Sequence, residues 1–153
     1  MTTIAASLDF QMIAADSRCS TDTWMFNVSK LRAGPGTAFG AAGAWDQILK
    51  FYAALEQNGE LGSECDVEVL ELRADSIWIY NGSLICFPIK ERFWAIGTGA
   101  PYAISAMHLG KSPIEAIEIA KLFDPGTGGE IDTMRIPNVS QSKSKRRGTN
   151  PSV

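Results

Sequence analysis

A continuous apolar run, MIAA at residues 12–15, constrains the fold of this chain more than any other feature. A strand with apolar side chains on both faces has to be covered on both faces, unlike a strand that alternates apolar and polar residues. The segment before it, residues 2–8, alternates loosely with Ile4, Ala6 and Leu8 on one face, and LDFQ is a suitable hairpin turn. These segments predict a hairpin buried inside a layered structure.

The remaining strand and helix segments are grouped along the chain rather than alternated. Short runs bounded by turn residues predict strands before and after one segment with the period of a helix. Two further helical segments and a closing strand follow, and this grouping predicts an antiparallel α+β domain with helices on the faces of stacked sheets. The expected strands are residues 2–8, 12–15, 27–32, 37–42, 66–73, 76–81, 83–89, 93–99 and 128–136.

Three segments have the period of a helix. The first covers residues 44–59 and is expected to close at Gly59. The second begins at Pro101 and stops at Gly110, and the third opens with SPIE, residues 112–115, which has the pattern of a capping box. The expected buried stripes are Trp45, Ile48, Leu49, Tyr52 and Leu55 in the first helix, Ala103, Ala106 and Met107 in the second, and Ala116, Ile119, Ala120 and Phe123 in the third.

The composition is that of an ordinary globular domain of 153 residues, with 45% hydrophobic and 20% charged residues. No apolar run approaches the roughly 20 residues that a membrane-spanning helix needs, and the N-terminus has no leader pattern. The three cysteines have no CxxC spacing, which indicates reduced thiols rather than a metal site. We therefore expect a cytoplasmic protein without a cofactor or a membrane partner.

The charge is distributed unevenly. Residues 138–153 carry four of the 14 basic residues and none of the 17 acidic ones, which leaves a net charge of −7 on residues 1–137. An acidic body argues against a nucleic-acid surface. We expect residues 1–137 to form the domain and residues 138–153 to be a disordered, solvated basic tail; a basic arm that contacts anions or a partner is the alternative.

Five motifs occur in an order that resembles the proteasome β-subunit and its bacterial relative HslV. They are TTIAAS…MIAADSR, NVSKL, AFGAAGAWD, AIGTGAPYA and EAIEIA…DPGTGG, spread over residues 2–136. The resemblance implies an N-terminal nucleophile (Ntn) hydrolase with a four-layer αββα sandwich, which agrees with the order of elements above. Only ALEQNGELGSECD separates the first helix from the next strand, where relatives have a second long helix, so we expect one helical layer to be reduced.

In this family the first residue of the mature chain is the nucleophile, and the resemblance assigns that role to Thr2. A Thr hydroxyl is a poor nucleophile unless a base removes its proton. The α-amine of an N-terminal residue, with a pKa of about 7.7–8.0, lies beside its own side chain and can be that base. Met1 blocks this arrangement, and a residue as small as Thr in second position normally permits its removal. The alternative is that Thr2 merely begins a strand.

The resemblance also assigns partners to Thr2. Asp16 and Lys30 match the acidic and basic partners of the nucleophile: the ammonium would stabilise the developing alkoxide and lower the pKa of the amine, and the carboxylate would orient the ammonium. Thr98 falls where the family has a Ser near the amine. Asp124 and Thr127 fall on its supporting Asp and Ser. Thr in place of Ser keeps the hydroxyl and adds a methyl group.

Further positions match the substrate-binding parts of the family. The backbone N–H of the oxyanion hole falls on Ala42, where relatives usually carry Gly. Cys19, Ser20 and Ala44 match positions beside an extended substrate, as strand addition requires. Gly40 falls on the floor of the pocket for the residue before the cleaved bond, and Gly there suggests a deep pocket for a large apolar side chain.

Three functions are compatible with these matches. The first is a threonine endopeptidase that cleaves unfolded polypeptides or peptides within a self-compartmentalised homo-oligomeric ring, with an ATP-dependent unfoldase as a possible partner. The second is a non-proteolytic Ntn amidase, which the AIGTGAPYA and DPGTGG motifs disfavour. The third is a catalytically silent structural ring subunit, which the presence of Thr2, Asp16 and Lys30 together disfavours.

Overall fold

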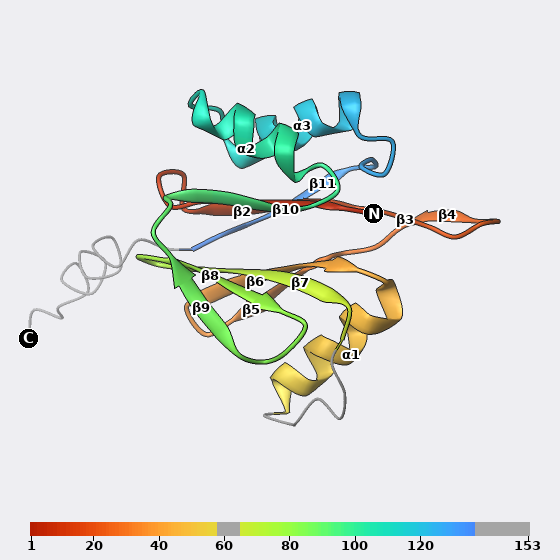
Figure 1. Ribbon diagram of the computed structural model, residues 1–153, viewed down its shortest axis with the longest axis horizontal. Helices are drawn as coiled ribbons and strands as arrows, with labels where there is room; N and C mark the ends of the chain where they lie inside the picture. The colour runs from red at the N-terminus through yellow and green to blue at the C-terminus, as the bar shows by residue number, and fades with distance from the viewer. Residues whose placement is uncertain (58–64, 137–153) are drawn as a thin grey trace, which may run out of the picture.

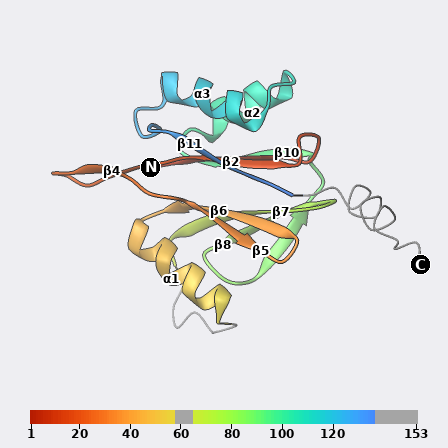
Figure 2. The ribbon, with the colours of Figure 1, turned by 180° about the vertical axis from the view of Figure 1, so that it is seen from behind.

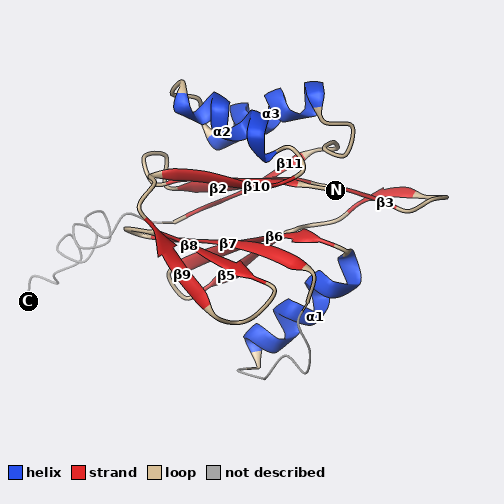
Figure 3. Ribbon diagram, viewed as in Figure 1, coloured by secondary structure: helices blue, strands red, loops and turns tan. Residues whose placement is uncertain are grey.

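The computed structural model describes residues 1–57 and 65–136. Two antiparallel sheets face each other, with α2 (Ala100–His108) and α3 (Pro113–Phe123) outside one sheet and α1 (Trp45–Glu56) outside the other (Figures 1 and 3). The predicted α+β class with antiparallel sheets is therefore confirmed. The strands are β1 (Thr3–Ser7), β2 (Met12–Asp16), β3 (Arg18–Ser20), β4 (Met25–Asn27), β5 (Leu31–Gly34), β6 (Thr37–Gly43), β7 (Val67–Arg73), β8 (Ile77–Asn81), β9 (Cys86–Ile89), β10 (Phe93–Gly97) and β11 (Ile131–Arg135).

The sheets differ in how the chain builds them. The five-stranded sheet has the order β5-β6-β7-β8-β9 and follows the chain directly, whereas the four-stranded sheet has the order β10-β1-β2-β11 and brings both ends of the described chain together. Strands β3 and β4 pair only with each other and form a ribbon that projects from the body beside the N-terminus (Figures 1 and 2). The hairpin β1–β2 therefore lies at the centre of its sheet, as its apolar sequence requires.

Strands β1 and β2 are buried on both faces, which confirms the prediction from the MIAA run. Ile4, Ile13 and Ala15 pack against the other sheet, where each buried isoleucine contributes about 1.5–3 kcal/mol to folding. Ala5 and Ala14 face α2 and α3 and are fully buried. Their small side chains let both helices pack close to the strands.

The buried stripe of α1 is the predicted one except at Leu49. Its buried residues are Ile48, Phe51 and Tyr52, whereas Leu49 is exposed. The ring of Phe51 lies 5.6 Å from that of Tyr80 on β8, so aromatic packing on the sheet buries Phe51 in place of Leu49. The predicted stop at Gly59 lies outside the described residues.

The predictions for the other two helices hold in part. The capping box at the start of α3 is present: Glu115 N donates to Ser112 Oγ at 3.2 Å, and Ser112 N donates to Glu115 Oε1 at 3.2 Å. Ala103, Ala106 and Met107 of α2 are buried as predicted. In α3, however, Ile117 is fully buried, whereas Phe123 is exposed and stacks on Tyr102.

The ribbon of β3 and β4 was not predicted, and the predicted strand at 27–32 is split. β4 ends at Asn27 and β5 begins at Leu31, which leaves Lys30 immediately before β5. The three-residue strands of the ribbon are largely exposed, so no alternation between apolar and polar residues marks them. None of the described helices is long and apolar enough to cross a membrane.

Candidate active site

The start of β1 directs two adjacent threonines to opposite faces of the sheet, because successive side chains of a strand alternate. Thr3 lies under the helices: its N–H donates to Asp16 Oδ1 at 3.0 Å, and its Oγ1 is 2.6 Å from Thr127 Oγ1. Thr2 shares the face of Ile4 and lies at the open end of the space between the sheets, where it borders residues of β6. The residue is only 2% exposed, and its hydroxyl makes no hydrogen bond to a described residue.

Asp16 and Lys30, both predicted partners of the nucleophile, form a buried ion pair. Lys30 Nζ donates to Asp16 Oδ1 at 3.0 Å and to the carbonyl of Arg18 at 2.7 Å. Gly128 N donates to Asp16 Oδ2 at 3.0 Å, so both carboxylate oxygens are satisfied. Burial lowers the pKa of the Lys30 ammonium, and the attraction of Asp16 offsets part of that effect. Lys30 and Thr2 line one hollow, and no hydrogen bond joins the two side chains.

The backbone of Lys30 is fixed from two sides. Its carbonyl accepts hydrogen bonds from Ala41 N at 3.3 Å and from the buried hydroxyl of Tyr52 at 3.0 Å. Burial raises the pKa of Tyr52, so the hydroxyl stays protonated and can donate. Helix α1 therefore holds the segment that carries the ammonium in place.

Thr98, Asp124 and Thr127 form the second predicted cluster. Both hydroxyls donate to Asp124 Oδ2 at 2.6 Å, and Gly126 N donates to Oδ1 at 3.1 Å. Burial alone would raise the pKa of Asp124, but these hydrogen bonds and the N-terminal ammonium lower it. Met1 itself packs against the Cα of Gly126, so the charged end of the chain lies near this carboxylate.

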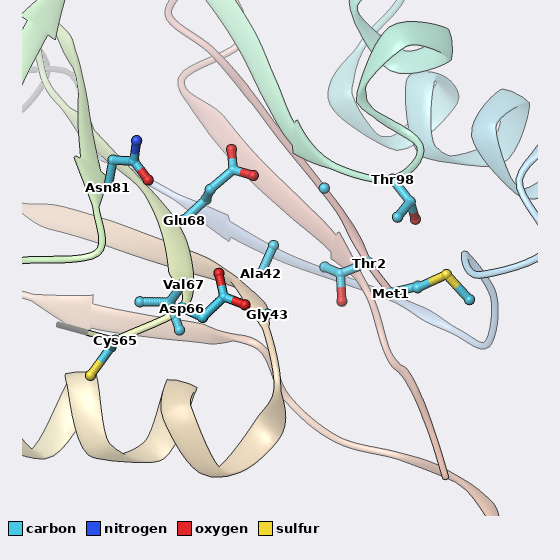
Figure 4. A pocket seen from close by; sticks show the side chains of 11 residues that line it. Met1, Thr2, Ala42, Gly43, Cys65, Asp66, Val67, Glu68, Asn81 and Thr98 are labelled. Carbon is cyan, nitrogen blue, oxygen red and sulfur yellow. The ribbon is translucent and has the colours of Figure 1, made fainter. Parts of the chain in front are cut away.

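Two hollows meet at Thr2. One, of about 450 Å³, lies between Thr2 and Thr98 on one side and the beginning of β7 on the other (Figure 4). The second, of about 100 Å³, lies toward the ribbon and α1. Thr2 and Gly43 line both, so an extended molecule could pass Thr2 and occupy a hollow on each side.

The register of β6 favours Gly43 rather than Ala42 as the backbone donor of an oxyanion hole. Ala41 N donates to Lys30 O, and Gly82 N occupies the carbonyl of Val67, the residue opposite Gly43. Because amides alternate along a strand, Ala42 N then points into the ladder with β7, and Gly43 N points past the end of β5; Gly43 lines both hollows with Thr2. The assignment of the oxyanion hole to Ala42 stays a prediction, and the register makes Gly43 N an alternative donor, because spacing alone does not give the direction of an amide.

The predicted substrate-binding residues separate into two groups. Cys19, Ser20 and Ala44 line the smaller hollow. Gly40 lies elsewhere: it is buried between the sheets, where a Cβ would collide with Ile4. Gly40 lines neither hollow at Thr2, and close packing of the two sheets accounts for this glycine.

Two glycines contribute to the site in a way that the sequence analysis missed. Gly97 has a φ of +93°, and a Cβ there would collide with the carbonyl of Thr2. A Cβ on Gly99 would collide with Thr3 Oγ1. The G-T-G pattern around Thr98 was the available signal for this close approach of β10 to the N-terminus.

Comparisons with known proteins give similarity at the level of structure. No family model matches the sequence, and no curated protein matches it at a significant level. BPH from Thiobacillus denitrificans, solved in complex with epoxomicin, matches with a TM-score of 0.63 and 16% identity, over 89% of this chain and 98% of that chain. Eukaryotic HslV from Trypanosoma brucei matches with a TM-score of 0.61 and 16% identity, over 87% and 98%.

Anbu (ancestral beta-subunit) from Yersinia bercovieri matches over 100% of this chain and 99% of its own, with a TM-score of 0.66 and 11% identity. Similarity at such low identity concerns the fold, and it confirms at that level the resemblance found in the sequence. This chain has the fold of the proteasome β-subunit-like Ntn hydrolases.

Proposed function

We propose that this protein is a threonine peptidase whose nucleophile is Thr2 once Met1 has been removed. One observation carries the proposal: Thr2 is a buried residue whose hydroxyl makes no hydrogen bond to a described residue, and it lines two hollows together with Gly43, one of them also lined by the buried ammonium of Lys30. The proposal takes the two sheets and their helices as the four-layer αββα sandwich, with one helical layer reduced to α1.

The chemistry follows from the residues that surround Thr2. Its free amine accepts the hydroxyl proton as Oγ1 attacks the substrate carbonyl, and Lys30 stabilises the negative charge on that oxygen. Gly43 N–H donates to the carbonyl oxygen as it becomes an oxyanion. The amine of the leaving peptide takes the proton, the C–N bond breaks, and water then hydrolyses the acyl ester on Thr2.

The cluster around Asp124 would hold the amine. In the structure the ammonium of Met1 contributes to the low pKa of Asp124. Removal of Met1 makes Thr2 the N-terminal residue, so the terminal ammonium is then that of Thr2. Thr98 and Thr127 then supply hydroxyls through which the proton is relayed.

We also propose a cytoplasmic homo-oligomeric ring, which encloses the sites, degrades unfolded polypeptide and works with an ATP-dependent unfoldase. Large apolar side chains are exposed on the ribbon, with Trp24 72% and Met25 67% exposed, and Leu122 and Phe123 are exposed at the end of α3. Such surfaces are typical of contacts between protein chains. Sedimentation of the purified chain tests this: a monomer at micromolar concentration would contradict the ring.

The first experiment is the intact mass of the purified protein before and after incubation with epoxomicin, the ligand found in the BPH structure. This peptide epoxyketone needs both the threonine hydroxyl and a free α-amine to form its ring adduct. We expect loss of Met1 and one adduct per chain. Thr2→Ser keeps the hydroxyl and should still be labelled, whereas Thr2→Ala should fold and stay unlabelled. Retained Met1 without an adduct would overturn the proposal in favour of a silent ring subunit.

A further inference from the structure

The wall of the larger hollow opposite Thr2 is acidic. Asp66 and Glu68 lie two residues apart and, by alternation, share a face of β7 with Leu70 and Leu72, which pack between the sheets. The face that is apolar in the core therefore becomes anionic where the space between the sheets opens. Asn81 of β8 lies opposite Glu68 in the ladder and continues the polar wall.

These carboxylates are available to a ligand. Both side chains belong to exposed residues, and neither makes a hydrogen bond or an ion pair with a described residue. The residues that line the hollow include no Lys, Arg or His. Figure 4 shows Asp66 and Glu68 on one side of this space and Thr2 on the other.

A second observation shows that the hollow is more than a group of acidic residues. Thr2 on its opposite wall is 2% exposed as a residue, and its hydroxyl has no partner among the described residues. A hydroxyl both donates and accepts hydrogen bonds, so a ligand in the hollow could supply that partner. The acidic wall and the hydroxyl thus border one space of about 450 Å³, which is large enough for an amino-acid side chain.

The two hollows have different positions relative to the cleaved bond. Cys19, Ser20 and Ala44, which match positions beside an extended substrate, line the smaller hollow, and the inference places the part of the substrate before the bond there. A chain that occupies this hollow and passes Thr2 continues into the larger one. The part of the substrate that follows the bond, and leaves first, therefore lies against the acidic wall.

We infer that the protein prefers substrates with Lys or Arg in the first two positions after the cleaved bond, and that Asp66 and Glu68 determine this preference. The inference rests on the proposed function. Acylation forms the bond between Thr2 Oγ1 and the substrate carbonyl carbon and breaks the C–N bond of the substrate. The nitrogen of the leaving peptide takes the proton that the Thr2 hydroxyl had passed to the α-amine of Thr2. The leaving peptide thus has a new N-terminal amine. Once this amine is fully protonated, its positive charge is attracted by Asp66 and Glu68 as well.

The test uses internally quenched peptides with one common sequence before the bond and Lys, Gln or Glu in the two positions after it. At low ionic strength we expect kcat/KM for the Lys peptide to exceed that for the Glu peptide about tenfold, the size expected for two solvent-exposed charge pairs. Because exposed charges are screened by salt, this ratio should fall toward one at about 0.5 M salt. Asp66→Asn with Glu68→Gln should reduce the ratio to below about twofold, and each single variant should reduce it in part.

The matched control is Asp75→Asn with Glu91→Gln, which removes the same charge from positions that do not line the hollow. This variant should keep the tenfold ratio. Equal cleavage of the Lys and Glu peptides by the unmodified protein would overturn the inference while leaving the peptidase proposal intact. A ratio that survives the Asp66/Glu68 variant, or is lost in the control, would likewise overturn it. Absence of cleavage together with absence of an epoxomicin adduct would overturn both.

Discussion

Lys30 Nζ lies 3.0 Å from Asp16 Oδ1, and the two side chains are 3% and 0% exposed. Two backbone N–H groups, from Thr3 and Gly128, complete the environment of the carboxylate. A charged pair with this much support is costly to break, because either charge left alone would be buried without compensation.

Lys30→Met should therefore destabilise the protein by about 3–5 kcal/mol and abolish labelling by epoxomicin. The double variant Asp16→Asn with Lys30→Met removes both charges and should recover part of that stability without recovering labelling. Urea denaturation and intact mass measure the two effects separately. A Lys30→Met protein that is labelled at the normal rate would exclude a role for the ammonium in the chemistry.

Gly97→Ala should disrupt the site, and Gly110→Ala is its control. Both glycines have a positive φ, +93° and +91°, so the backbone strain of the substitution is similar, about 1–2 kcal/mol. Only at Gly97 does the added Cβ collide with the carbonyl of Thr2; at Gly110 no atom lies within 4 Å. We expect Gly97→Ala to cost at least about 2 kcal/mol more in urea denaturation and to remove peptidase activity. Equal costs would mean that β10 does not confine Thr2.

Asp124 should make stability depend on acid pH. Its pKa in the folded protein is below the ordinary value of 3.8, so the unfolded chain takes up a proton first as the pH falls. Its stabilisation is complete well above pH 3.8 and disappears as the pH falls through the folded pKa. Asp124→Asn should therefore be less stable by about 1–2 kcal/mol at pH 7, and the difference should shrink below pH 4. Urea denaturation across this range measures it, and a constant difference would contradict it.

Tyr52→Phe and Tyr80→Phe form a matched pair that separates stability from positioning. Each removes one buried hydroxyl: that of Tyr52 donates to the carbonyl of Lys30 at 3.0 Å, and that of Tyr80 to Glu71 at 2.6 Å. Both variants should lose about 1–2 kcal/mol of stability. Only Tyr52→Phe should also lower kcat, by several-fold, because Lys30 is less well positioned; an equal effect of both on kcat would contradict this.

The sequence predicted the parts of the fold that depend on local patterns. The MIAA run, the capping box at Ser112 and the buried face of α2 could be read directly, because burial on both faces and helix capping leave short, specific signals. The β3–β4 ribbon could not, because strands of three exposed residues leave none. Phe51 took the place of Leu49 because the aromatic residues of the sheet decide which side of α1 is covered.

The sequence named the residues of the candidate site by type, and the structure adds the directions that spacing cannot give. Thr2, Asp16, Lys30, Thr98, Asp124 and Thr127 were all named from the sequence, and the structure brings them together as two hydrogen-bonded groups with Thr2 beside them. The structure favours Gly43 over Ala42 as the backbone donor and places Gly40 between the sheets, because the direction of an amide and the packing between sheets depend on strand register. Asp66 and Glu68 were read only as part of a strand, since their effect requires the opposite wall.

The pairing of β1 with β2 fixes the position of each residue at the start of the chain. Ile4 lies opposite Ala15, and this register alone decides which of two chemically identical neighbours, Thr2 or Thr3, opens to the space between the sheets. If β1 slipped by one residue against β2, the two threonines would exchange surroundings, and the hydroxyl of Thr3 instead of that of Thr2 would face the space between the sheets. Under the proposed function, removal of one residue from the N-terminus frees the amine of Thr2, whereas removal of two deletes the proposed nucleophile.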